Sequence, residues 1–224
     1  MKLRRMMIIM LLVAVLVPDT GRICAAASDE SVGTNRDAST QKVSSRAKEI
    51  LEGMSLKEKV GQMFFSGAWT TGDAKKMVKK YHLGGVLLYK NSFDGRTKAG
   101  VKKQISQIQK ASDIKLLIPV DEEGGTVIRV SGNKKLRKTP FKSPSKTYAA
   151  GGWKLVKKEA KEKAKLLKSL GVNTNLAPVA DLPKNRKSYI YNRAFSTNAK
   201  KTSKFVRLVV KEFEKQGEIS CRES

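Results

Sequence analysis

The stretch Leu116-Leu117-Ile118-Pro119-Val120-Asp121-Glu122-Glu123-Gly124-Gly125 joins a short apolar run to three consecutive carboxylates and two glycines. Because its apolar residues do not alternate with polar ones, the run predicts a strand buried on both faces, as in a parallel sheet under helices. Such folds build their active sites at the carboxyl ends of strands, where these carboxylates fall. Gly124 and Gly125 suit a tight turn or a close ligand. The alternative is a solvated acidic turn that only ends a strand.

Predicted strands and helices alternate on both sides of this stretch. The predicted strands cover residues 62–66, 84–89, 116–121 and 173–181. Helical spacing of apolar residues predicts helices over residues 43–51, 73–81 and 153–170. Two more helices are marked by Val101, Ile105 and Ile108 and by Phe205, Val209, Val210 and Phe213. The capping-box spacing of Ser55 and Glu58 predicts a further, short helix. This order predicts an α/β fold with a parallel sheet and right-handed crossovers.

The chain has four complete strand–helix units and the start of a fifth strand after residue 217. No glycine-rich phosphate loop follows any of these strands, which argues against a nucleotide site. The Gly-x-Ser-x-Gly elbow of serine hydrolases is also missing from the sequence. With 224 residues, 40% of them hydrophobic, the chain has enough material for one substantial domain.

The N-terminal region has the composition of a targeting segment. A basic start is followed by an apolar run of about a dozen residues and by Ala25-Ala26-Ala27, so residues 1–27 are predicted to be a secretory signal peptide. An uncleaved N-terminal anchor is the alternative. Residues 28–42 are polar and predict a flexible linker, which leaves residues 43–224 as the domain. We expect a secreted protein, or one associated with the cell wall or membrane.

The chain is strongly basic, with a formal net charge of +26. Behind a signal peptide, this charge favours an anionic cell wall or membrane surface as a partner, and nucleic acid conflicts with export. The lysines also fit the solvated faces of helices. Cleavage would remove Cys24 and leave Cys221 without an intramolecular partner, and the lone His82 fits a helix cap better than a metal ligand. No metal or other cofactor is predicted.

Five motifs in the domain occur in an order that is similar to one enzyme family. At Asp121-Glu122-Glu123-Gly124-Gly125-Thr126-Val127-Ile128-Arg129 the sequence resembles glycoside hydrolase family 3, in particular its bacterial β-N-acetylhexosaminidase branch. The resemblance continues at Glu58-Lys59-Val60-Gly61-Gln62-Met63, Gly84-Gly85-Val86-Leu87, Asn175-Leu176-Ala177-Pro178-Val179-Ala180-Asp181 and Asn192-Arg193-Ala194-Phe195. It implies a (β/α)8 barrel of the TIM type that hydrolyses terminal β-linked N-acetylglucosamine with retention of configuration.

The resemblance also implies roles for individual residues. Asp121 matches a strand-end carboxylate that accepts hydrogen bonds from sugar hydroxyls, and Arg129 and Arg193 match arginines that hold the same sugar. A carboxylate facing guanidinium groups suits a neutral polyol, which offers both donors and acceptors. Asp181 either supports this site or only caps the end of a strand.

The catalytic groups that the family uses have no counterpart in the sequence. Asp121 and Glu123 are an obvious pair of carboxylates, but the resemblance places the nucleophile much further along and the acid/base on a histidine in a Lys-His-Phe-Pro-Gly-His-Gly loop after the fifth strand. Here that position reads Arg222-Glu223-Ser224. We therefore expect a barrel truncated to about its first four to five βα units, inactive by itself.

The sequence leads to a glycoside hydrolase of the β-N-acetylhexosaminidase type, acting on N-acetylglucosamine in peptidoglycan fragments or related glycans. The alternative is a non-catalytic secreted protein that binds cell-wall glycans. A second polypeptide that supplies the other half of the barrel is neither indicated nor excluded by the sequence.

Overall fold

The computed structural model describes residues 45–217 and 219–220. The chain divides into two compact units, Met1–Ser55 and Leu56–Ser224. In the first, residues 45–53 form a helix, which ends two residues later than predicted. The predicted signal peptide (1–27) and linker (28–42), and the predicted start of this helix at residue 43, lie outside the described residues.

Five short strands of the second unit run parallel to one another. They are β1 (Phe65–Ala68), β2 (Gly85–Leu88), β3 (Pro119–Val120), β4 (Thr174–Asn175) and β5 (Ile219–Ser220). Strand β1 pairs with β2, and β4 lies between β3 and β5. A parallel bridge between Gly85 and Leu117 connects the two groups, with the Val86 amide donating to the Leu117 carbonyl at 2.9 Å. The spatial order of the strands therefore follows the chain, as in the barrel that the resemblance implies.

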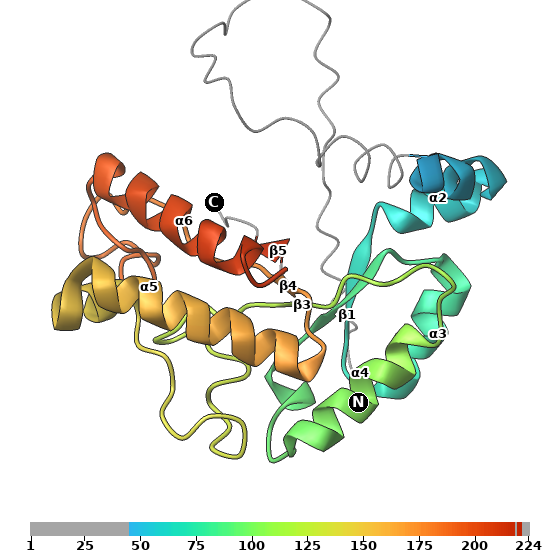
Figure 1. The fold of residues 1–224 in the computed structure, drawn as a ribbon, viewed down its shortest axis with the longest axis horizontal. Coiled ribbons are helices and arrows are strands. Elements are labelled where there is room, and N and C mark those ends of the chain that lie inside the picture. The colour runs from blue at the N-terminus through green and yellow to red at the C-terminus, as the bar shows by residue number, and fades with distance from the viewer. Residues whose placement is uncertain (1–44, 218, 221–224) are drawn as a thin grey trace, which may run out of the picture. The chain divides into compact units, whose positions relative to one another are not determined.

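Helices separate the strands along the chain. They are α2 (Leu56–Gln62), α3 (Thr71–Tyr81), α4 (Lys98–Gln109), α5 (Pro144–Leu170) and α6 (Ala199–Glu214), with a 3-10 turn η1 (Lys90–Ser92) after β2. Helix α3 packs beside α4, and α5 packs beside α6 (Figure 1). In the described part of the chain, no helix combines the length and apolar character that a membrane span requires.

Local side-chain bonds explain where several helices begin and end. Helix α3 begins two residues before its predicted start because the Thr70 hydroxyl accepts a hydrogen bond from the Asp73 amide at 3.0 Å. His82 forms its C-cap with a φ of 52°, which confirms the predicted capping role. Gly171 ends α5 in the left-handed conformation, also as predicted.

Several predicted boundaries are wrong, most of them at strands. The strand predicted over residues 173–181 forms only at Thr174–Asn175, and the strand predicted over residues 116–121 only at Pro119–Val120. Gln62, predicted to begin a strand, is the last residue of α2, where its side chain donates to the carbonyl of His82 at 2.8 Å. Strand β1 begins only at Phe65. Helix α5 runs from Pro144 to Leu170, but Gly151 and Gly152 have non-helical φ and ψ angles and divide it at a kink. The part after the kink begins at Trp153, as predicted, whereas the part before it was not predicted.

The two faces of the sheet differ in their surroundings. On one face, Val86 and Leu88 are buried, and the Ser66 hydroxyl contacts the Met77 sulfur of α3. On the other face, the alternate residues Phe65 and Leu117 stay partly exposed. Since side chains alternate along a strand, the helices cover the first face, and the second is where a barrel of this type has its interior.

The apolar stripe of α6 anchors the helix layer in the core. Phe205, Val209 and Phe213 are buried as predicted, whereas Val210 is only half-buried and Glu212 is buried in addition. Phe213 has no exposed surface, so its ring contributes fully to the core.

We predict that Phe213→Ala lowers the free energy of unfolding by about 3–5 kcal/mol, because it removes a fully buried ring and leaves a cavity. The control is Phe64→Ala, since Phe64 is 39% exposed and its loss should cost clearly less. Urea unfolding followed by circular dichroism measures both. Equal losses for the two variants would show that α6 is not packed as described.

Candidate functional site

The chain turns sharply directly after β3. Gly124 and Gly125 have φ angles of 102° and 73°, which favour glycine, and a Cβ on Gly124 would lie 2.2 Å from the carbonyl oxygen of Lys142. The amides of Glu123 and Gly124 both donate to the Val127 carbonyl at 3.1 Å. The predicted tight turn is confirmed.

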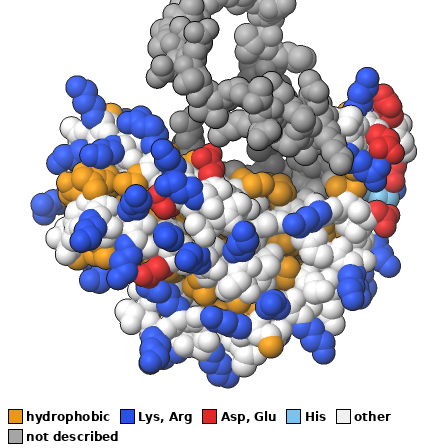
Figure 2. Space-filling model, in the orientation of Figure 1, with side chains coloured by type: hydrophobic (Ala, Val, Ile, Leu, Met, Phe, Trp, Pro, Cys, Tyr) orange, Lys and Arg blue, Asp and Glu red, His pale blue; other side chains and the backbone are white. Residues whose placement is uncertain are grey.

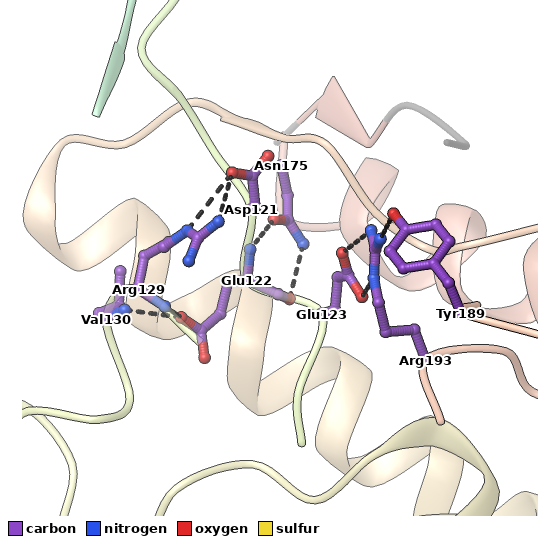
Figure 3. Close-up of polar contacts among 8 residues, drawn as sticks. All are labelled: Asp121, Glu122, Glu123, Arg129, Val130, Asn175, Tyr189 and Arg193. Carbon is purple, nitrogen blue, oxygen red and sulfur yellow. Dashed lines mark hydrogen bonds and ion pairs between the residues drawn. The ribbon is translucent and has the colours of Figure 1, made fainter. Parts of the chain in front are cut away.

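Glu122 is fully buried at the centre of this turn. Its carboxylate accepts hydrogen bonds from the amides of Val130 at 2.6 Å and Arg129 at 2.8 Å (Figure 3). It also accepts a hydrogen bond from the Ser131 hydroxyl at 2.5 Å. The Glu122 amide donates to Oδ1 of Asn175 on β4 at 3.0 Å. These hydrogen bonds together offset the desolvation free energy of the buried carboxylate. Glu122 therefore connects the strand end, the following loop and β4.

Asp121 and Arg129 form a partly exposed pair beside Glu122. Nε and Nη2 of Arg129 donate to Oδ2 of Asp121 at 3.4 and 3.2 Å. The Asp121 side chain is 18% exposed and the Arg129 side chain 29% exposed, so both remain accessible to a ligand. Both contacts use Oδ2, which leaves Oδ1 of Asp121 for other donors. Two of the three predicted binding residues thus lie together.

Arg193, the third predicted binding residue, pairs with a different carboxylate. Its Nη2 and Nε reach the two carboxylate oxygens of Glu123 at 2.6 and 3.0 Å, and its Nη1 donates to the Tyr189 hydroxyl. The Glu123 side chain is only 1% exposed. Arg193 therefore lies at the carboxyl end of the sheet with much of its guanidinium already bonded, and its role in binding stays a prediction.

The three consecutive carboxylates make different kinds of contact, as Figure 3 shows: Asp121 bonds the Arg129 side chain, Glu122 bonds backbone amides of the following loop, and Glu123 bonds the Arg193 side chain. The sequence pattern did not distinguish Glu122 from its neighbours. The one available signal was the alternation of side chains, which directs Glu122 away from the side of Asp121 and Glu123. Asp181 lies in the loop six residues beyond the end of β4, and its two predicted roles stay open.

Lys163 of α5, which no sequence motif marks, also contacts the turn. Its side chain is half-buried and its Nζ donates to the Glu123 carbonyl at 2.7 Å. Burial lowers the pKa of Lys163 below its ordinary value of 10.5, while the carboxylates of Glu122, Glu159 and Glu123 act in the opposite direction. This cation supports the backbone of the turn from the helix layer.

The remaining positive charges are distributed widely. Figure 2 shows Lys and Arg side chains scattered over the visible face, with no single basic stripe. Such a distribution fits the solvated helix faces predicted from the sequence and gives a general attraction to anionic surroundings.

The comparison with known families identifies the fold. Residues 55–221 match the Glycosyl hydrolase family 3 N terminal domain. The chain belongs to this family. Its fold is therefore the TIM-barrel-like α/β fold predicted from the sequence, and the strands and helices from α2 to β5 form part of that barrel.

Three relatives illustrate the match. The chain is 30% identical over 155 residues to beta-hexosaminidase A of Pseudoalteromonas piscicida, covering 66% of this chain and 26% of that protein. The structure of a family 3 beta-N-acetylglucosaminidase from Paenibacillus has a TM-score of 0.68 and 27% identity, over 76% of this chain and 33% of that one. NagZ from Neisseria gonorrhoeae, in complex with N-trifluoroacetyl-D-glucosamine, has a TM-score of 0.57 and 20% identity, over 71% of this chain and 49% of that one, and supports the fold alone. The chain thus spans half or less of each relative.

We predict that Glu122→Gln lowers the free energy of unfolding by about 1–3 kcal/mol, because the amide group turns a donor toward donors in a buried position. Exposed Glu214 on α6 provides the control Glu214→Gln, which should change little. Urea unfolding is the measurement. Equal stability of the two variants would contradict the role of Glu122 as the anchor of the turn.

Lys163 predicts a pH dependence of stability. Because folding lowers its pKa, the unfolded chain binds more protons between the folded pKa and 10.5, so Lys163 makes the free energy of unfolding rise with pH across that window. Relative to Lys163→Met, the wild type should therefore gain stability as pH increases from neutral to 10.5. Lys158→Met, at a side chain 70% exposed, is the control. A constant difference between wild type and K163M across this range would contradict the lowered pKa.

Proposed function

We propose that the chain contributes the sugar-binding part of a glycoside hydrolase of the β-N-acetylhexosaminidase type. The observation that carries the proposal is the Asp121–Arg129 pair at the carboxyl end of β3. A carboxylate oxygen accepts from sugar hydroxyls while the guanidinium donates to them, and the mutual pairing of the two groups holds both in place before a ligand arrives. The family match and the beta-hexosaminidase relative support this assignment.

The proposed substrate is a terminal β-linked N-acetylglucosamine in peptidoglycan fragments or related glycans. The similarity to the Paenibacillus beta-N-acetylglucosaminidase supports this sugar. We also propose that the protein acts outside the cytoplasm, at the cell wall or membrane, because residues 1–27 have the composition of a signal peptide and the charge of +26 suits an anionic surface.

The carboxylates of the turn are assigned to binding and support. A retaining glycosidase uses two carboxyl groups roughly 5 Å apart, one as nucleophile and one as acid/base. Glu122 is occupied by backbone amides and Glu123 by Arg193, so neither is available as the partner of Asp121. We therefore propose that the polypeptide of 224 residues binds the sugar and does not hydrolyse the bond.

We predict that Asp121→Ala weakens the binding of N-acetylglucosamine about 10- to 100-fold, the range expected for losing hydrogen bonds to a charged acceptor. Isothermal titration calorimetry on the wild type, D121A and the control Asp113→Ala measures this change. Asp113 is exposed and lies before β3, so its removal should leave the affinity unchanged.

The same preparations, assayed with a chromogenic β-N-acetylglucosaminide, test the chemical part of the proposal. Binding without turnover is expected. Turnover by the wild-type polypeptide would contradict the proposal that it binds without hydrolysing. Equal affinities of wild type and D121A for the sugar would contradict the binding role of Asp121.

A further inference from the structure

Two aromatic side chains lie at the carboxyl ends of neighbouring strands, close to the candidate site. Trp69 follows the last residue of β1 and is 73% exposed, and Tyr89 follows the last residue of β2. Their rings stack with centroids 5.6 Å apart and planes inclined by 30°. The exposed indole and the stacked phenol ring together offer an apolar surface on which a ligand or partner can pack.

The strand register puts this aromatic pair in line with Asp121. Ala68 pairs with Leu88, so the next position pairs Trp69 with Tyr89. Gly85 and Leu117 are bridge partners on neighbouring parallel strands. Tyr89 and Asp121 each come four residues after one of these partners, so they occupy corresponding positions on the two strands. Because parallel strands end at the same edge, Trp69, Tyr89 and Asp121 form a row across three strands.

The aromatic pair lies on the face of the sheet that the helices do not cover, the face of Phe65 and Leu117. A Cβ placed on Gly67 would lie 2.5 Å from the Tyr89 ring, so the ring covers Gly67. Gly67 points away from the face on which Ser66 contacts the Met77 sulfur of α3. Tyr89 therefore lies on the side away from the helices. Asp121 comes four residues after the partly exposed Leu117, so the alternation of side chains places it on that same face.

Hydrogen bonds fix the backbone around the aromatic pair. The Asn91 side chain of η1 donates to the Trp69 carbonyl at 2.8 Å. The Asn133 side chain, from the loop after Arg129, donates to the Phe93 carbonyl at 2.6 Å and thereby joins that loop to the segment after β2. The aromatic pair and the Asp121–Arg129 pair are thus parts of one connected edge of the sheet.

We propose that Trp69, supported from behind by Tyr89, stacks on a second sugar ring of the glycan whose first ring Asp121 and Arg129 hold. The inference rests on the proposed function and specifies its ligand as an oligosaccharide of at least two sugars. The C–H groups of a pyranose carry partial positive charge and suit the negative face of an indole ring. An aromatic surface beside a carboxylate suits a neutral sugar better than a nucleotide, whose phosphates Asp121 would repel.

The test compares one sugar with two. Wild type, Trp69→Ala, Trp69→Phe and Asp121→Ala are titrated with N-acetylglucosamine and with N,N′-diacetylchitobiose by calorimetry. We expect W69A to weaken binding of the disaccharide about 3- to 10-fold while changing the monosaccharide less than about 2-fold, and W69F to retain part of the preference. D121A should weaken both sugars. Tyr81→Ala, at an exposed aromatic residue that ends α3, is the control.

The other results would overturn the inference in distinguishable ways. Equal weakening of both sugars by W69A would place Trp69 on the first ring, and no effect of W69A would remove it from the site. Failure of the wild type to bind either sugar would contradict the proposed function itself. Binding of an oligothymidylate that is lost in W69A, with no effect on the sugars, would assign the aromatic pair to nucleic acid.

Discussion

The buried carboxylate of Glu122 is the contact on which the candidate site depends. It holds the amides of the loop that follows the turn, and its own amide is bonded to Asn175 on the next strand of the sheet. The carboxylates on either side of Glu122 each pair with a different arginine. Asp121 meets Arg129 of the same loop, and Glu123 meets Arg193, which comes from a distant part of the chain.

Exposure separates the roles of the two ion pairs. Glu123 and Arg193 are nearly buried and bonded at two points, so breaking this pair would leave a buried charge, at a cost of about 3–5 kcal/mol. Asp121 and Arg129 are more exposed and bonded through one carboxylate oxygen, and such a pair contributes about 1 kcal/mol or less to folding. Its polar groups can therefore exchange partners with a sugar at little cost, which is the property that a binding site requires.

The sequence predicted the order of the strands and helices and the tight turn after β3, because both follow from patterns of neighbouring residues. The apolar run before Asp121 indicated the strand, and the glycines after it indicated the turn. It did not distinguish Glu122 from the carboxylates beside it, since burial depends on a loop that returns to the turn. The row from Trp69 to Asp121 depends on the register between strands, and the early start of α5 at Pro144 was hidden by the glycines at its kink.

A crystal structure of the complex with N-acetylglucosamine is the most direct test of this account. It should show a sugar hydroxyl donating to Oδ1 of Asp121, a second hydroxyl accepting from Arg129, and Glu122 still bonded to the amides of Arg129 and Val130. A sugar bound away from this pair, or a Glu122 carboxylate turned out of the turn toward the sugar, would contradict it.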